Sequence, residues 1–178
     1  MLQSFYDSVT NPVDVSFAAI LTRMIAAMIC GGIIGIDRER RGKPAGFRTL
    51  MLVSLASAIF MIITFKLMQL SAEIYANVNP DPIRVIEAVI TGIAFLGAGA
   101  IIQSRGNVQH MTTGATIWLA GSAGVACGAG YLVIAAMTTV LGFIIVALIG
   151  AAEARLHRAA DTGHEDKGGE SEPKKKKS

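Results

Sequence analysis

The chain alternates between long apolar runs and short polar connections. Five apolar runs approach the ~20 residues that a helix needs to cross the ~30 Å hydrocarbon layer of a bilayer. The pattern therefore predicts an all-α, polytopic membrane helix bundle with five transmembrane helices, in one domain over residues 16–150. The expected spans are residues 16–36, 49–70, 83–103, 112–127 and 131–150.

Local signals predict where these helices begin. Asp81 followed by Pro82 indicates a helix start, because an aspartate caps free amide groups and proline suits the first helical position. Asp14 or Ser16 is the expected cap of the first span. The other expected caps are Thr49, Thr112 and Thr113. Residues 104–111 are expected to form a tight polar turn before the fourth span.

The polar segments predict the orientation of the chain. The loop after the first span carries five Lys or Arg, whereas residues 1–15 and residues 71–82 carry none. The positive-inside rule then places the N-terminus outside and the C-terminus in the cytoplasm. We expect residues 1–15 to be a short extracytoplasmic lead without a cleavable signal peptide. Residues 151–178 are expected to be a basic cytoplasmic tail that becomes disordered after a few helical turns.

Composition supports a membrane protein and limits the chemistry. The mean hydropathy is +0.53 and 52% of residues are hydrophobic. The net charge of +3 follows from basic residues beside apolar runs, so we expect a lipid bilayer and no nucleic acid as partner. Cys30 and Cys127 are expected to pack as small apolar residues. No pattern indicates an enzyme, a cofactor or a zinc site, and the identity of any metal stays open.

One pair of charges falls inside the predicted spans. Arg23 and Glu87 enter the membrane from the same predicted side and reach similar depths. A charge in a membrane span usually faces the bundle and has a partner. We therefore predict an intramembrane ion pair between Arg23 and Glu87. The alternative is that both side chains extend outward to the membrane surface.

A second polar cluster is predicted at the cytoplasmic ends of the spans, around the first and third connections. Charges of both signs follow the first span, and polar residues flank the fourth. We interpret these residues as a structured polar site, although a simple surface anchor is the alternative. The predicted site consists of Asp37, Arg38, Glu39, Arg48, Thr49, Asn107, Thr112 and Thr113.

Small residues recur at helical spacing within the spans. Such residues let the backbones of neighbouring membrane helices approach closely. The predicted helix-packing positions are Ala27, Gly31, Gly35, Gly92, Gly97, Gly99 and Gly124. These faces also make a homodimer plausible.

Three motifs in this order resemble the MgtC/SapB family of bacterial membrane proteins. They are GGIIGIDRERRGKPAGFRTLMLVS, which begins at Gly31, GIAFLGAGAII, which begins at Gly92, and NVQHMTTGATIW, which begins at Asn107. The resemblance covers roughly residues 27–135. His110 stands where the family commonly has Gly. The soluble C-terminal domain of many members is also missing from the sequence, so we expect a short form of the family.

The resemblance implies a multi-pass protein of the bacterial inner membrane. It links the chain to growth in low magnesium, virulence and survival inside host cells, and stress adaptation. It also implies binding to F-type ATP synthase, as in some members. The site residues carried over are Asp37, Arg38, Glu39, Arg48, Thr49, Asn107, Thr112, Thr113 and Trp118.

Two functions from different classes follow. The first is a non-enzymatic regulator that binds another membrane complex, such as F-type ATP synthase. The second is a subunit of a Mg²⁺ transporter or channel, for which Asp37, Glu39 and Glu87 are the candidate ligands. Arginines surround these acids and repel cations, which favours the regulator. An anion or a phosphate-bearing ligand suits the cluster of Arg38, Arg40 and Arg48 better.

Overall fold

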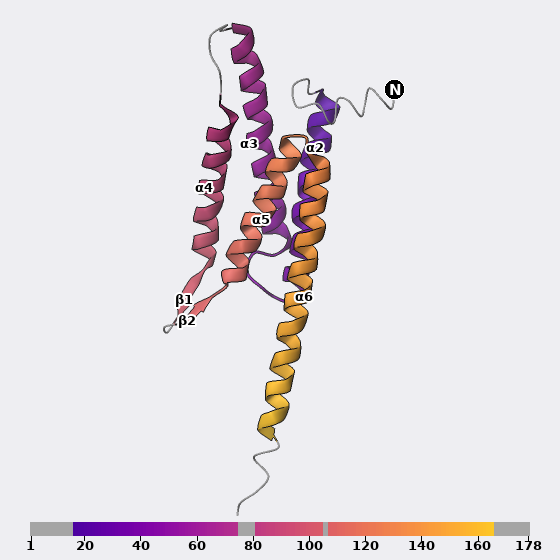
Figure 1. The fold of residues 1–178 in the computed structure, drawn as a ribbon, viewed down its shortest axis with the longest axis vertical. Helices are drawn as coiled ribbons and strands as arrows, with labels where there is room; N and C mark the ends of the chain where they lie inside the picture. Colours follow the sequence, from indigo (N-terminus) through magenta and orange to yellow (C-terminus); the bar gives the residue numbers. More distant parts are fainter. Residues whose placement is uncertain (1–15, 75–80, 105–106, 166–178) are drawn as a thin grey trace, which may run out of the picture. The chain divides into compact units, whose positions relative to one another are not determined.

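The computed structural model describes residues 16–74, 81–104 and 107–165 of the chain. The described part is helical apart from its turns and one two-stranded hairpin, which confirms the predicted helical class (Figure 1). The elements are α2 (Phe17–Arg40), α3 (Phe47–Ile74), α4 (Pro82–Ala100), β1 (Ile102–Ser104), β2 (Asn107–Gln109), α5 (Met111–Gly128) and α6 (Leu132–Glu165). The predicted lead over residues 1–15 and the last residues of the tail, 166–178, lie outside the described part.

In the described part of the chain, three helices are long and apolar enough to cross a membrane: residues 17–40, 47–69 and 82–100. A shorter apolar helical stretch covers Leu132–Leu148, and α5 is an apolar helix of 18 residues. The chain is therefore a membrane protein by the length and composition of its helices. The five-span count and the orientation of the chain stay predictions.

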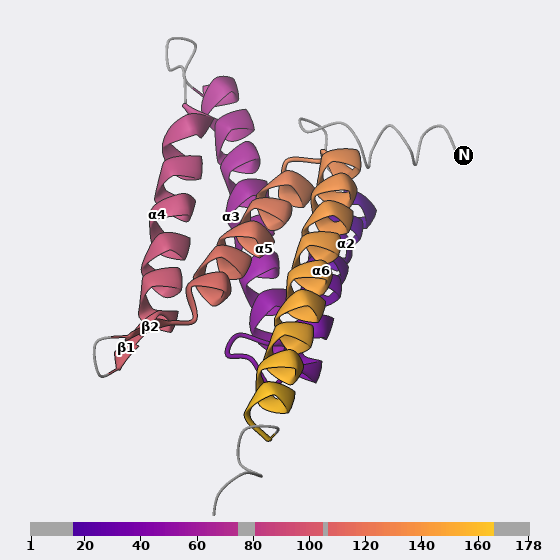
Figure 2. The same ribbon diagram turned by 60° about the horizontal axis from the view of Figure 1, so that its bottom comes forward.

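The chain forms two compact units, residues 1–143 and 144–178. In the first unit, α2 packs against α3 and α5, α3 packs against α5, and α4 packs mainly against α5. Two views of the ribbon show α2 and α4 on opposite sides of α5 (Figures 1 and 2). The described residues of the second unit, 144–165, continue helix α6 beyond the predicted end of the fifth span.

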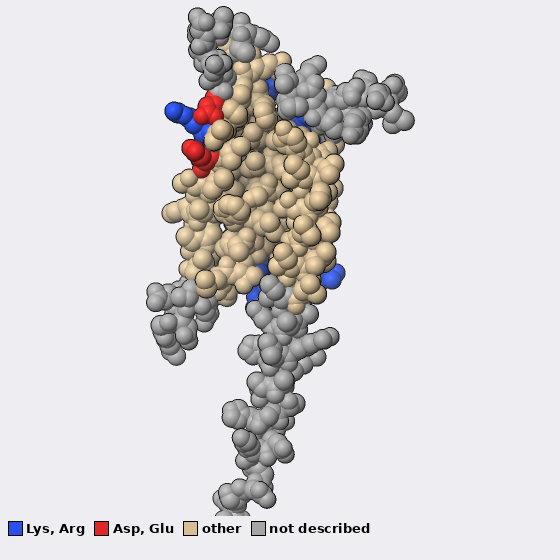
Figure 3. All heavy atoms as spheres, viewed as in Figure 1, with Lys and Arg blue, Asp and Glu red and all other residues tan. Residues whose placement is uncertain are grey.

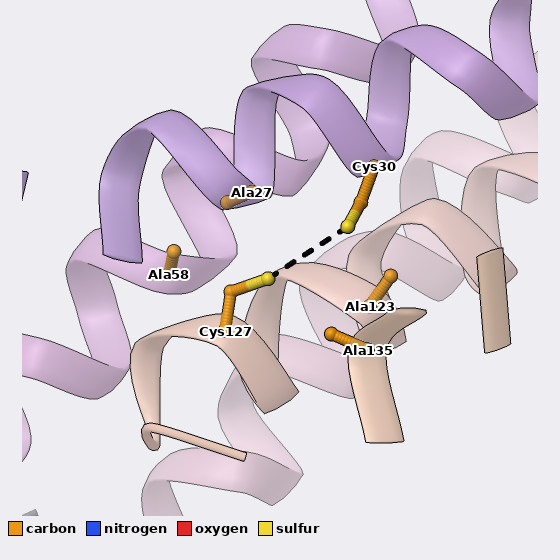
Figure 4. Packing of buried hydrophobic residues seen from close by; sticks show 6 residues of the cluster. All are labelled: Ala27, Cys30, Ala58, Ala123, Cys127 and Ala135. Carbon is orange, nitrogen blue, oxygen red and sulfur yellow. Dashed lines mark hydrogen bonds between the residues drawn. The ribbon is translucent and has the colours of Figure 1, made fainter. Parts of the chain in front are cut away.

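The first unit has a core of small and aliphatic side chains. One cluster consists of Ala27, Cys30, Ala58, Ala123, Cys127 and Ala135 (Figure 4). The other consists of Ile34, Leu50, Val53, Ile93, Ile117 and Ala120. Since alanines dominate the first cluster, the helices that contribute to it come close together there.

Helices α2, α3 and α5 meet most closely at Ser54 of α3. A Cβ atom added at Gly124 of α5 would overlap the carbonyl oxygen of Ser54, and one added at Gly31 of α2 would lie 2.9 Å from the Ser54 Cβ. Ser54 is fully buried. Two of the predicted packing glycines therefore allow three helix backbones to pass one another.

The other predicted packing residues divide into two groups. Ala27 is buried in the alanine-rich cluster, Gly35 lies against the backbone of Phe47, and Gly97 lies against Gly114. Gly92 and Gly99 have no neighbouring atom within 4 Å of an added Cβ among the described residues, so the packing predicted for them was wrong within this chain. Both are exposed on α4, which packs mainly on α5 and less extensively on α3.

The third predicted span ends earlier than expected. Helix α4 stops at Ala100, and the extended backbone of Ile101 leads into a short antiparallel hairpin. In that hairpin Ile102 pairs with Gln109 and Ser104 pairs with Asn107. The segment expected to form a tight polar turn, residues 104–111, therefore reverses the chain direction as predicted, but Ser104 and Asn107–Gln109 belong to the paired strands.

Helix starts follow local signals in two of the four predicted cases. The Ser16 hydroxyl accepts from the amide of Ala19 at 3.4 Å, and the Asp81 carboxylate accepts from the amide of Ile83 at 2.9 Å. The caps predicted at Thr49 and at Thr112 or Thr113 were wrong. Helix α3 begins at Phe47, two residues earlier, and His110 precedes the first residue of α5.

Candidate functional site

Arg38 is the buried centre of the predicted polar site. It lies near the end of α2, and only 4% of its surface is exposed. Its Nη2 atom donates to the hydroxyl of Thr113 at the start of α5, and also to the carbonyl of Pro44 at 3.4 Å. A charged donor makes a stronger hydrogen bond than a neutral one. Arg38 therefore joins three segments: the end of α2, the following turn and the start of α5.

Glu39 stabilises the beginning of α3. Its Oε2 atom accepts a hydrogen bond from the backbone amide of Phe47 at 3.0 Å. The first amides of a helix have no partner within the helix, and negative charge there is favourable. The carboxylate reaches this amide past Gly46, where any Cβ atom would overlap it. Position 46 therefore requires a glycine, because a side chain there would displace the Glu39 carboxylate.

The turn between α2 and α3 has an ordered backbone. The amides of Arg41, Gly42 and Lys43 donate to the carbonyls of Asp37, Glu39 and Arg38, at 3.1, 3.1 and 3.0 Å. Gly42 and Ala45 adopt left-handed conformations, with φ of 60° and 56°. The chain turn predicted at this glycine- and proline-containing loop is therefore present.

Asp37 lies on a different side of α2 from Arg38. Its carboxylate pairs with Arg41 at 2.7 Å, one turn further along. Among the predicted charged residues of this helix end, Arg38 and not Asp37 contacts the start of α5. The sequence could not distinguish them, because neighbouring residues of a helix point about 100° apart and the direction of α5 is set by packing.

The remaining predicted site residues are spread around this centre. Arg48, Thr49 and Thr112 are exposed. Asn107 lies at the start of β2, where its backbone pairs with Ser104. The structure therefore brings Arg38, Glu39 and Thr113 into one connected arrangement, while Arg48, Thr49 and Thr112 are exposed around it. His110 has a left-handed φ of 66°, a conformation that favours glycine.

A hollow lies beside the turn, between the end of α2 and the start of α3. Its volume is about 400 Å³. It is lined by Ile36, Glu39, Arg40, Phe47 and Arg48. The exposed guanidinium groups of Arg40 and Arg48 make this hollow positively charged on balance, with one carboxylate among its lining residues.

Arg23 forms a second buried polar contact at the other end of α5. It is fully buried, and its Nη1 atom donates to the carbonyl of Gly128 at 3.2 Å. The three preceding carbonyls of α5, at residues 125–127, accept from the amides of Ala129, Tyr131 and Gly130. Arg23 therefore satisfies the last carbonyl of the helix, which would otherwise lack a backbone partner.

The predicted ion pair between Arg23 and Glu87 is not formed in the described part of the chain. Glu87 is exposed on α4, and its backbone carbonyl accepts from the Thr91 hydroxyl at 2.7 Å. A similar predicted depth in the membrane did not bring the two charges together. Helix α4, which carries Glu87, packs on α5 and α3, whereas the Arg23 side chain contacts the last residue of α5. Gly128 is the partner that sequence reasoning missed. The sequence signal for this site is the segment Gly128-Ala129-Gly130, which ends α5 and leaves its last carbonyls without helical partners.

Charged side chains elsewhere in the described residues also lie near the ends of the helices. In the view of Figure 3, the red and blue atoms of the described residues lie toward the ends of the helices and the surface between them is uncharged. The residues whose structure is described contain no group of three or more His, Cys, Asp or Glu side chains that could hold a metal ion.

Cys30 and Cys127 face each other with their sulfur atoms 4.0 Å apart (Figure 4).

Comparison with known proteins gives a consistent result. An uncharacterized protein of Haemophilus influenzae is 32% identical over 140 residues, which cover 78% of this chain and 59% of that protein. The Escherichia coli K12 protein named "Putative magnesium transporter YhiD" is 39% identical, over 64% of this chain and 52% of its own. Protein MgtC of Brucella abortus is 36% identical, over 71% of this chain and 49% of its own.

The chain spans about half to three fifths of the length of these curated relatives. No solved structure matches it significantly. The model of the MgtC family matches residues 24–155, which include the contact between Arg38 and Thr113 and the turn between α2 and α3 and begin one residue after Arg23. The chain therefore belongs to the MgtC family.

Proposed function

We propose that this protein is a non-enzymatic regulator in the bacterial inner membrane. It binds another membrane complex, F-type ATP synthase by family resemblance, during adaptation to low magnesium or to acid or intracellular stress. Its membrane domain crosses the bilayer five times, with the N-terminus outside and the C-terminus in the cytoplasm. The family membership and the Mg²⁺-related name of the Escherichia coli relative support the link to magnesium.

The contacts at the two ends of α5 support the proposed topology. Arg38 and Thr113 join the end of α2 to the start of α5, and Arg23 and Gly128 join the opposite ends of the same helices. Antiparallel helices of this length suit successive membrane crossings. The basic loop between α2 and α3 then lies on the cytoplasmic side.

Labelling in intact cells tests this orientation. In a chain with Cys30 and Cys127 replaced by alanine, a membrane-impermeant maleimide should label Asp81→Cys in intact cells. Lys43→Cys should be labelled only after the membrane is permeabilised. The reverse pattern would contradict the proposed orientation.

The contacts of the described carboxylates favour a regulator over a Mg²⁺ transporter. Asp37 pairs with Arg41, Glu39 accepts from the amide of Phe47, and Asp81 accepts from the amide of Ile83. Mg²⁺ requires oxygen ligands that can replace or hold its water molecules. Three of the described carboxylates therefore already serve the fold, and a large apolar surface on α4 remains for a partner. Its exposed residues include Ile83, Phe95 and Leu96.

Reconstitution with purified F-type ATP synthase tests the proposal. Vesicles containing both proteins should show slower ATP-driven proton pumping than vesicles with the synthase alone. A photo-crosslinking residue at the exposed Phe95 should attach to a synthase subunit. The same group at the buried Ile34 should not. Unchanged pumping and an absence of crosslinks from Phe95 would overturn the proposal.

A Mg²⁺ transporter subunit is the alternative function, supported by the name of the Escherichia coli relative. Liposomes that contain the purified chain and a Mg²⁺-sensitive dye measure this activity directly. Magnesium entry that is lost in Asp37→Ala, but kept in the helix-cap variant Asp81→Ala, would show that the protein is a transporter and would overturn the regulatory function. The homodimer stays a prediction, and the unpartnered Gly92 and Gly99 on α4 would suit a second copy of that helix.

A further inference from the structure

The hollow beside the turn between α2 and α3 combines two exposed arginines with apolar lining. Arg40 is the last residue of α2 and Arg48 is the second residue of α3, so the two cations come from different helices. Ile36 and Phe47 contribute apolar surface to the same hollow, whose volume is about 400 Å³. This combination suits a ligand with a negatively charged group and an apolar part.

The hollow is held open by contacts that do not involve its two arginines. Arg38 fixes the turn to Thr113 and Pro44, and the Glu39 carboxylate fixes the first amide of α3. Since both helix ends are anchored in this way, the backbones of Arg40 and Arg48 are already in place before a ligand binds. A ligand would need to order only their side chains, which lowers the entropic cost of binding.

The local charge favours an anion. Glu39 is the one acid among the residues that line the hollow, and its Oε2 atom is directed at the amide of Phe47. Asp37, the other acid of this helix end, is paired with Arg41. The positive end of the α3 dipole adds to the field of the arginines. Two guanidinium groups are well suited to phosphate oxygens, because each offers a planar pair of donors.

The position of the hollow in the fold indicates the source of the anion. Helix α2 ends at Arg40 and α3 begins at Phe47, and both are candidate membrane spans. The hollow therefore lies where two spans meet the membrane surface, which is the level of lipid headgroups. We propose that it binds a phosphate-bearing anionic group through Arg40 and Arg48, from either an anionic phospholipid or a free phosphate compound.

Lipid retention by the purified full-length chain tests this site. Native mass spectrometry from neutral detergent would count the phosphatidylglycerol and phosphatidylcholine molecules that each chain keeps. The wild-type chain should prefer phosphatidylglycerol. R40Q/R48Q should weaken this retention by roughly 10- to 30-fold, from the loss of two basic groups near a headgroup. The matched control R84Q/K66Q removes two exposed charges elsewhere on the molecule and should retain phosphatidylglycerol as the wild type does.

A second measurement distinguishes the source of the phosphate. Thermal unfolding in detergent is compared in inorganic phosphate and in chloride at equal ionic strength. Stabilisation specific to phosphate that R40Q/R48Q abolishes would identify a free phosphate compound as the ligand. If instead only retained phosphatidylglycerol depends on Arg40 and Arg48, the ligand is a lipid headgroup.

Glu39→Gln keeps the proposal testable if the double variant does not fold. An amide oxygen still accepts from Phe47, while the negative charge is removed, so anion retention should rise. The site would be overturned by unchanged or weaker retention in E39Q. It would also be overturned if R40Q/R48Q changed neither lipid nor phosphate binding, or if R84Q/K66Q lost retention equally. Neither readout involves F-type ATP synthase or Mg²⁺ transport, so these results do not depend on the proposed regulatory function.

Discussion

The guanidinium of Arg23 in α2 binds the carbonyl oxygen of Gly128, the last residue of α5, at 3.2 Å. Arg38 makes the corresponding contact with Thr113 at the other end of α5. The separation from Arg23 to Arg38 equals that from Thr113 to Gly128, fifteen residues in each case. Two arginines of one helix therefore fix an antiparallel neighbour at both of its ends.

Replacing Arg23 should destabilise the bundle. Arg23→Met keeps much of the apolar stem but leaves the Gly128 carbonyl without its side-chain donor. An unsatisfied buried polar group costs about 1–3 kcal/mol. Thermal unfolding in detergent should show this loss, whereas Arg84→Met on the exposed start of α4 should have little effect. Equal stability of the two variants would show that the Gly128 contact contributes nothing.

The hydroxyl of Thr113 should contribute to stability through Arg38. Thr113→Val preserves the shape of the side chain and removes the acceptor, and we expect a loss of about 1–3 kcal/mol. Thr112→Val is the matched control, because the Thr112 side chain is exposed one residue earlier. A double-mutant cycle with Arg38→Met should give a coupling energy. Strictly additive effects would contradict the hydrogen bond.

Two glycines that look alike in the sequence should respond in opposite ways to alanine. Gly124→Ala forces a Cβ against the carbonyl of Ser54 and should cost about 1–3 kcal/mol by overpacking. Gly99→Ala meets open space and should stabilise the helix by about 0.4–1 kcal/mol. Unfolding midpoints in the same detergent provide the comparison. A large loss at position 99 would indicate that a second molecule packs on this face.

Cys30 and Cys127 should form a disulfide within one chain under mild oxidation. Their sulfur atoms are 4.0 Å apart, and the surrounding residues are small. A bonded pair requires ~2.05 Å, which a modest side-chain rotation can supply. Thiol counting after denaturation should show the loss of both free thiols without a dimer on a non-reducing gel, and Cys30→Ser should prevent it. A dimer linked through these cysteines would place them at a surface instead.

Some features of this chain were predictable because they depend on nearby residues. The cap formed by Asp81 before Pro82 requires only its own turn of helix. The break between the first two helices follows from Gly42, Pro44 and Gly46. The helical class and the membrane-spanning length of α2, α3 and α4 follow from continuous apolar runs, whose length matches the hydrocarbon thickness of a bilayer.

The hairpin after α4 is an intermediate case. Ile101, Ile102 and Val108 continue the apolar pattern and have β-branched side chains, which suit a strand as well as a membrane helix. A short apolar run does not distinguish the two by periodicity alone. The backbone of Ile101 resolves the ambiguity, because its extended conformation ends the helix.

The amino-acid sequence by itself determined that polar residues would gather at helix ends, because a charge in the middle of a span costs too much. Only the tertiary structure decided which of them meet. Arg23 could reach several carbonyls or acids, and Asp37, Arg38 and Glu39 project in different directions from one helix turn. The partners of Arg23 and Arg38 depend on how α2, α3 and α5 pack against one another. That packing depends on contacts between residues far apart in the chain, which local sequence cannot specify.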